Sequence, residues 1–204
     1  MGQLVVIAGN LGVGKTTLTQ KLSTQLPAVP YWEEPEKHPF QTQFYRDPAR
    51  WTLTNQIDFL IFRAEQENII RHSAGIGIQD GGLDQDFHLF TRYLQETNRL
   101  TTAEFQLCER IYRLIRDQLP PPELILYIQT PFDVLLYRRT LRGRDTDTQM
   151  VTIEQLHKME QYLEDWIINQ KKSKVIRLCS DQTDDLFEKI LPEMAKQVSK
   201  ALHI

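Results

Sequence analysis

The chain has 204 residues, a formal net charge of −3 and a hydrophobic share of 41%. This length can bury a sizeable core, and we expect one compact domain. The slightly acidic balance excludes the global positive field that attracts nucleic acid polymers or anionic membranes, so neither is an expected partner. Neither a secretion signal nor a membrane-spanning run is visible. The only two cysteines, Cys108 and Cys179, predict no disulfide framework or zinc site and fit a reducing, cytoplasmic setting.

The first predicted strand, Leu4 to Ala8, leads into the segment GNLGVGKT at 9–16, and a helical pattern follows from Thr17 to Gln25. The spacing G-x-x-x-x-G-K-T in this strand-to-helix context is typical of a phosphate-binding loop. Backbone N–H groups of such a loop, and the positive end of the helix after it, bind phosphate oxygens. We expect ATP to be bound here by Gly9, Asn10, Leu11, Gly12, Val13, Gly14, Lys15, Thr16 and Thr17.

Two residues of the loop have specific expected roles. Lys15 would reach the β- and γ-phosphates, and the hydroxyl of Thr16 would bind Mg²⁺. The sequence therefore predicts a nucleoside triphosphate and Mg²⁺ as cofactors.

A second strand is predicted from Ala28 to Trp32, directly before a pair of glutamates. The segment Pro39 to Arg50 is expected to be rich in turns, and a long helix is expected from about Pro48 to about His72. Gln56 and Arg63 lie seven residues apart on this helix, so they share one face. Two turns separate them, which lets them contact opposite ends of a small ligand.

The rest of the chain continues the alternation of strands and helices. The predicted elements are a strand at 75–80, helices at 87–96 and 102–119, a strand at 124–128, helices at 131–141 and 151–170, a strand at 174–178 and a helix at 184–202. This order predicts an α/β fold of the three-layer P-loop NTPase type, with a parallel sheet of about five strands and helices on both faces.

Carboxylates follow the second strand, as Glu33 and Glu34, and end the third strand, as Asp80. Ligands bind at the carboxyl edge of open α/β sheets, where these strand ends meet. A carboxylate near a γ-phosphate acts as general base toward an attacking hydroxyl or as a ligand of Mg²⁺. We expect Glu33 or Glu34 to be the base, and Asp80 to join Thr16 at the metal.

A cluster of arginines, Arg138, Arg139, Arg142 and Arg144, ends the helix predicted at 131–141. Guanidinium groups over a transferring phosphoryl group stabilise its charge. The alternative is a solvated basic face. With a phosphate loop upstream, we interpret the segment of about 138–150 as a lid.

Several segments occur in the order found in the deoxynucleoside kinases. They are GNLGVGKTT, EEPEKHPF, FYRDPARW followed by Gln56, the strand end at Asp80, RRTLRGRDTD and LHKMEQYLEDWI. The chain resembles this family up to about Trp166, and the bacterial deoxyadenosine and deoxyguanosine kinases are the branch it resembles most. The resemblance implies transfer of the γ-phosphate of ATP to the 5′-hydroxyl of a deoxynucleoside, in a homodimer with a helical interface.

The resemblance leaves two candidates for the catalytic base. The family's carboxylate precedes a proline, which points to Glu34 before Pro35. An ungapped alignment through the HPF segment at 38–40 points to Glu33 instead. We prefer Glu34 and keep Glu33 open.

Other site residues are implied by the same resemblance. Tyr45 and Asp147 match residues that bind the sugar 3′-hydroxyl, and Gln56 matches the glutamine that pairs with the base edge. Arg63 and Asp86 match a charged pair that flanks the base and helps to select purine or pyrimidine. The residues that match the phosphate and transfer machinery are Lys15, Arg139, Arg142 and Arg144.

One departure from the family lies at the third strand end, where Gly81 replaces the arginine that normally follows the acid. In relatives that arginine pairs with the catalytic carboxylate, a contact worth about 1.5–3 kcal/mol. Its loss predicts a rate about tenfold to a hundredfold lower if the contact counts fully in the transition state. Arg92 or a lid arginine could fill the gap.

These observations support three hypotheses. The first is a deoxynucleoside kinase, purine-preferring, in nucleotide salvage. The second is a nucleotide-binding protein of the same fold with weakened catalysis, which Gly81 favours, and the third is a nucleoside monophosphate kinase. Lys15 and the predicted lid argue against a bare binder. Tyr45 and Gln56 suit an unphosphorylated nucleoside and disfavour the third hypothesis.

Overall fold

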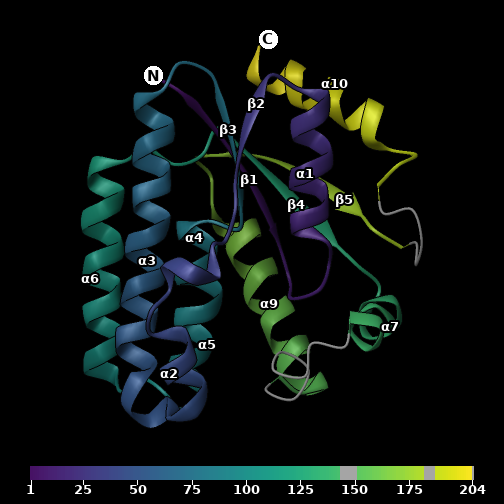
Figure 1. The fold of residues 1–204 in the computed structure, drawn as a ribbon. Helices are drawn as coiled ribbons and strands as arrows, with labels where there is room; N and C mark the ends of the chain where they lie inside the picture. Colours follow the sequence, from purple (N-terminus) through teal and green to yellow (C-terminus); the bar gives the residue numbers. More distant parts are fainter. Residues whose placement is uncertain (143–150, 182–186, 204) are drawn as a thin grey trace.

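The computed structural model describes residues 1–142, 151–181 and 187–203, and in them five parallel strands form one sheet (Figure 1). The strand order is β2-β3-β1-β4-β5. The strands are β1 (Gln3–Gly9), β2 (Ala28–Tyr31), β3 (Ile76–Asp80), β4 (Leu124–Gln129) and β5 (Lys174–Cys179). The predicted α/β fold with a parallel sheet of five strands is thus confirmed.

Helices cover both faces of the sheet (Figure 1). The α-helices are α1 (Lys15–Gln25), α2 (Gln41–Arg46), α3 (Pro48–His72), α4 (Leu83–Gln85), α5 (Arg92–Glu96), α6 (Thr102–Gln118), α7 (Phe132–Arg142), α9 (Ile153–Asn169) and α10 (Leu191–Leu202). A 3₁₀ turn, η1, spans Pro35–Lys37, and a π-helical segment, η2, spans Asp86–Thr91.

The central strand β1 is apolar toward both faces because each face meets a separate core. Leu4, Val6 and Ala8 pack into the cluster that α3, α6 and α9 cover. Val5 and Ile7 pack into the cluster formed with α1 and α10. Side chains alternate along a strand, so a continuous apolar run is what a strand between two helical layers requires.

Helix α3 begins where its sequence predicts. The side chain of Asp47 accepts a hydrogen bond from the backbone N–H of Arg50, and Pro48 occupies the first turn. Both features stabilise a helix N-terminus. The buried face of α3 is unusually polar and includes Thr52, Asn55, Gln56, Arg63, Gln66, Glu67 and Arg71. This polar face supplies side chains to the carboxyl edge of the sheet.

Two segments differ from the sequence expectation. The segment predicted as turns contains α2, a six-residue helix with no buried side chain, which packs against α3. Such a helix has no apolar stripe to reveal it. The helix predicted at 87–96 instead starts at Leu83 and widens into η2, where the carbonyl of Asp86 accepts hydrogen bonds from Gln56 Nε2 and Thr91 Oγ1.

The strand register brings three strand ends to one edge. Ile7 of β1 pairs with Asp80 of β3, and Gln79 pairs with Tyr31 of β2. The phosphate loop and the residues after β2 and β3 therefore adjoin one another. Both chain ends lie toward the opposite edge of the sheet (Figure 1). In the described ranges, no helix has both the length and the apolar character that a bilayer crossing needs.

Candidate active site

The phosphate loop connects β1 to α1, and its first residue, Gly9, allows a close approach of backbones. A Cβ atom at Gly9 would lie 2.8 Å from Val13 Cγ2 and 2.9 Å from the Ile128 carbonyl oxygen. Its φ of +155° is also one that other residues rarely adopt. The loop thus folds tightly against β4, and a side chain at Gly9 would disrupt it.

Lys15 lies at the first turn of α1 and reaches back over the loop. Its Nζ donates to the carbonyl oxygens of Gly9, at 3.1 Å, and Asn10, at 2.9 Å. Desolvation lowers the pKa of the Lys15 ammonium, and the carboxylates of Asp80 and Glu33 partly oppose this. A cation held in this way gains strongly from an anionic ligand because a phosphate is a better partner than two neutral carbonyls.

Thr16 and Asp80 form an oxygen-rich pair beside the loop. The Thr16 hydroxyl donates to Asp80 Oδ2 at 2.6 Å, and Thr16 is exposed. Mg²⁺ prefers oxygen ligands and usually keeps waters and substrate phosphates in its shell. The described residues contain no cluster of three or more His, Cys, Asp or Glu that would hold a metal alone. The pair therefore fits a cation that is shared with a phosphate ligand.

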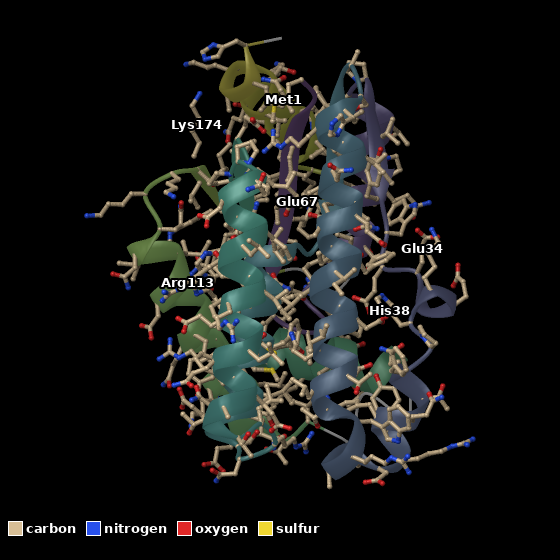
Figure 2. The ribbon with its side chains drawn as sticks, turned by 90° about the vertical axis from the view of Figure 1, so that its left-hand side faces the viewer. Met1, Glu34, His38, Glu67, Arg113 and Lys174 are labelled. Atoms are coloured by element: carbon tan, nitrogen blue, oxygen red, sulfur yellow. The ribbon has the colours of Figure 1, made fainter. Side chains whose placement is uncertain are left out.

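The two adjacent glutamates after β2 have different surroundings. Glu33 Oε2 accepts a hydrogen bond from Arg63 Nη2 at 3.2 Å, and the negative charge of Glu33 acts on Lys15. Glu34 forms an ion pair with Lys37 of the next turn at 2.9 Å. Figure 2 places Glu34 at the outer side of α3, away from the helix. Glu33 is thus the glutamate beside Arg63 and Lys15, and Glu34 is the one beside Lys37.

Arg63 and Asp86 form a buried ion pair, with Arg63 Nε donating to Asp86 Oδ2 at 2.9 Å. Burial lowers the pKa of the Arg63 guanidinium, but the carboxylates of Asp86 and Glu33 more than offset this, and its pKa lies above its usual value. Arg63 is therefore a permanent cation beside the strand ends. The two residues predicted as a charged pair do lie in contact.

Gln56 lies on the same buried face of α3. Its Nε2 donates to the carbonyl oxygen of Asp86 at 3.2 Å and to Thr91 Oγ1 at 2.9 Å. A base edge that pairs with both amide atoms would have to replace these partners. Tyr45, on α2, has a half-buried ring that packs on Phe44, and its hydroxyl accepts from Gln41.

The arginines of α7 differ from one another. Arg138 is buried and donates to the carbonyl of Val13 and to Ser180, so it connects the phosphate loop with the residue after β5. The stem of Arg139 packs on the phosphate loop, because a Cβ at Gly12 would lie 3.3 Å from Arg139 Cγ. Both arginines thus contact the phosphate loop, and the lid interpretation of the segment stays a prediction.

Three further predicted residues lie beyond what the structure describes. Arg144 and Asp147 fall outside the described residues, and so does the side chain of Arg142, the last residue of α7. Their assigned roles remain predictions from the sequence.

Some residues that support the loop were missed by the sequence analysis. The backbone N–H of Gly9 donates to Gln85 Oε1 at 2.9 Å. Asn10 Nδ2 donates to Glu160 Oε2 of α9 at 3.0 Å, and Tyr127 donates to the other oxygen of Glu160 at 2.5 Å. A carboxylate within the apolar stripe of the helix predicted at 151–170 was the available signal for Glu160. Gln85 has no such signal.

A parallel sheet with a glycine-rich loop, a lysine and a Thr–Asp oxygen pair at its carboxyl edge defines the class of P-loop nucleotide-binding proteins. The family model described as deoxynucleoside kinase matches residues 5–203. The chain belongs to the deoxynucleoside kinase family. It is a kinase that uses ATP to phosphorylate deoxynucleosides, as salvage enzymes do.

Several characterised relatives carry related activities. The chain is 25% identical over 203 residues to the deoxyadenosine/deoxycytidine kinase of Bacillus subtilis, covering 98% of this chain and 93% of that protein. It is 30% identical over 155 residues to the deoxyguanosine kinase of the same organism, covering 74% and 73%. The fold matches a deoxyadenosine kinase from M. mycoides solved with bound dCTP, with a TM-score of 0.76, 19% identity and 97% and 100% coverage.

Proposed function

We propose that this chain transfers the γ-phosphate of ATP to the 5′-hydroxyl of a purine deoxynucleoside, with Glu33 as general base. The observation that carries this proposal is the contact between Glu33 and the permanent cation Arg63, beside the phosphate loop. Glu34 is engaged with Lys37 instead. A general base must lie close to the acceptor hydroxyl and to the phosphoryl group that is transferred. Of the two glutamates, only Glu33 has Lys15 and Arg63 as charged neighbours.

The chemistry follows from these positions. The Glu33 carboxylate accepts the proton of the 5′-hydroxyl as its oxygen forms a bond to the γ-phosphorus. The bond from that phosphorus to the β–γ bridging oxygen breaks, and ADP leaves. Lys15 would exchange its two carbonyl partners for phosphate oxygens and offset the charge that develops on them. We assign Arg139, Arg142 and Arg144 to the same phosphates.

We further assign Mg²⁺ to Thr16 and Asp80. Held by these two side chains, Mg²⁺ would neutralise part of the charge of the phosphates. The 2.6 Å contact between the two side chains and the exposure of Thr16 support this assignment.

The nucleoside side of the site is proposed to consist of Gln56, Arg63 and Asp86, with Tyr45 and Asp147 at the sugar. Arg63 and Asp86 form their ion pair beside Gln56, and the resemblance assigns such a pair to the selection of purine or pyrimidine. One B. subtilis relative is named for deoxyadenosine and deoxycytidine and the other for deoxyguanosine, so a purine deoxynucleoside occurs in both names. We infer that the chain acts as one domain in the cytoplasm, with its lid at about 138–150.

We also propose a homodimer formed through α3 and α6. The two helices lie side by side on one face of the molecule, with Glu67 between them (Figure 2). Both helices carry exposed aliphatic side chains, namely Ile61, Ile69, Leu107 and Leu114. Single exposed apolar residues are common, but a set on two packed helices supports an interface.

The test is transfer from γ-labelled ATP with Mg²⁺ to deoxyadenosine, deoxyguanosine, deoxycytidine and thymidine in parallel, with Lys15→Ala as the blank. We expect label on a purine deoxynucleoside and none in the blank. Transfer to a pyrimidine alone would contradict the proposed preference. ATP binding without transfer to any of the four would favour a binding protein instead.

A further inference from the structure

The end of β3 carries an unusual pair, Gly81 and Gly82, directly after Asp80. Gly81 has a φ of +73°, in the left-handed region. A Cβ atom at Gly81 would lie 3.1 Å from Arg63 Nη2 and 3.6 Å from Arg63 Cζ. Real Cβ contacts are rarely this short, so the guanidinium of Arg63 occupies the space that a side chain at Gly81 would need.

Arg63 reaches two carboxylates from that space. Its Nε donates to Asp86 and its Nη2 to Glu33, while Nη1 is buried and has no hydrogen-bond partner among the described residues. The guanidinium thus connects the base-binding side of the site with the phosphate side.

Two of the arginines considered for this place have other partners. Arg92 lies over the ring of Tyr162 and pairs with Glu96 and Asp165 at the surface. Arg138, from the lid segment, is bound to the backbone of the phosphate loop. Arg92 and Arg138 therefore do not take the place of the missing arginine, while Arg144 and the side chain of Arg142 lie outside the described residues.

We propose that Arg63 is the positioning residue for Glu33, and that the absence of a side chain at Gly81 is what gives its guanidinium this place. The inference rests on the proposed function, in which Glu33 is the general base. Arg63 then has two roles. It pairs with Asp86 beside the nucleobase of the substrate, and it orients the reacting carboxylate of Glu33.

The physical reason is that the Glu33 side chain is 43% exposed and needs a partner to orient it. Its backbone is held on both sides, because Gln66 Nε2 donates to the Trp32 carbonyl at 2.6 Å and the backbone N–H of Lys37 donates to the Glu34 carbonyl at 2.8 Å. Asp80 and Asp86 are negative and would repel a carboxylate that approaches the loop. The planar fork of a buried arginine offsets that repulsion and fixes the direction of approach.

The structure also predicts what an arginine at position 81 would do. Gly81→Arg would be strained at a φ of +73°, and its Cβ would push against Arg63. The substitution is therefore expected to lower kcat, although it restores the residue type that the family has there.

The test compares Gly81→Ala with Gly75→Ala. Both positions have a positive φ, but a Cβ at Gly75 would meet nothing within 4 Å. We expect Gly81→Ala to lower kcat about tenfold, with little change in the KM for ATP, because it weakens one charge-assisted hydrogen bond to the reacting carboxylate. Gly75→Ala should keep the kcat of the unmodified chain.

A double-mutant cycle separates positioning from general damage. In a Glu33→Gln background, Gly81→Ala should have no further effect on kcat, because the group that Arg63 positions is already lost. Arg63→Lys provides a second variant, which keeps the charge but not the fork, and it should show the same dependence on Glu33. Independent, additive effects of Gly81→Ala and Glu33→Gln would overturn the inference.

Failure of the proposed function has a different signature. If the unmodified chain transfers phosphate, the proposed function stands whatever the variants do. If it transfers none, a crystal structure of Gly81→Ala still decides the inference. We expect Arg63 Nη2 beyond hydrogen-bond distance from Glu33, and an unchanged contact would overturn it.

Discussion

Two adjacent glutamates, Glu33 and Glu34, follow β2, and their side chains have different partners. Glu33 accepts a hydrogen bond from Arg63, whereas Glu34 pairs with Lys37. The sequence motif fits either glutamate, so it does not identify the one beside Arg63. Lys15, Thr16 and Asp80 were predictable because the spacing of the phosphate loop and the strand end fixes their positions.

The contacts of Arg63 with both Asp86 and Glu33 could not be predicted from the spacing of a motif. It depends on the empty space beside Gly81, which is a property of packing between β3 and α3. The sequence shows the missing arginine but not which side chain moves into its place.

The lowered pKa of Lys15 predicts that nucleotide binding takes up protons in alkaline solution. A bound polyphosphate favours the charged ammonium, so a lysine that has partly lost its proton in the free protein regains it in the complex. Calorimetric titration with ADP at about pH 9, in buffers of different ionisation enthalpy, should show proton uptake, and the affinity should fall as the pH rises. Lys15→Ala should bind weakly without this uptake, and equal uptake in both proteins would contradict the assignment.

Tyr127 tests the link between the phosphate loop and α9. Tyr127→Phe removes the hydrogen bond to the Glu160 carboxylate, which also holds Asn10. We expect the free energy of unfolding in urea to fall by about 1.5–3 kcal/mol, as for other hydrogen bonds to charged groups, and the KM for ATP to rise. Tyr137→Phe is the matched control, because Tyr137 is exposed. An equal loss in both variants would contradict the role of Tyr127.

At the scale of elements, long helices and buried strands were predictable because each has a clear hydrophobic period. Helix α3 starts and ends as expected, and its cap residues Asp47 and Pro48 are visible in the sequence. The short helix α2 and the π-helical segment η2 were not, because both depend on tertiary contacts. In η2 the carbonyl of Asp86 accepts side-chain donors, a competition that no local pattern encodes.

A buried polar network links α3, α4 and α6. Arg116 of α6 forms ion pairs with Glu67 and Asp84, and Tyr112 donates to Asp84 at 2.7 Å. His88 Nε2 lies 3.2 Å from the Tyr112 hydroxyl. The network joins the segment after Asp80 to the outer helices.

His88 makes the stability of this network depend on pH. Burial lowers the pKa of His88, the Asp84 carboxylate opposes this, and the positive charges of Arg92 and Arg116 add to it. The unfolded chain therefore binds the proton more readily, and the stability that neutral His88 contributes is present above about pH 6.5 and lost as the pH falls.

We expect the melting temperature of the unmodified chain to fall more steeply than that of His88→Gln between about pH 7.5 and about pH 5.5. Differential scanning fluorimetry across this range measures the difference. Parallel curves for the two proteins would contradict a lowered pKa of His88.

For the whole molecule, the proposed homodimer depends on the face formed by α3 and α6. Replacing Leu107 and Leu114 together by arginine would bring charges into the interface and convert the dimer to a monomer in analytical ultracentrifugation. Ile168→Arg on α9 is the matched control, because Ile168 is 66% exposed and Leu114 is 67% exposed. A monomeric unmodified chain, or dissociation by the control alone, would contradict the assigned face.

The most direct measurement is kcat for Glu33→Gln and Glu34→Gln, compared side by side with saturating ATP and the preferred deoxynucleoside. Loss of a general base costs about a hundredfold to ten-thousandfold. We predict a loss of that size for Glu33→Gln, and a kcat within about twofold of the unmodified chain for Glu34→Gln, whose partner is Lys37. A large loss for Glu34→Gln with an active Glu33→Gln would contradict the account of the site.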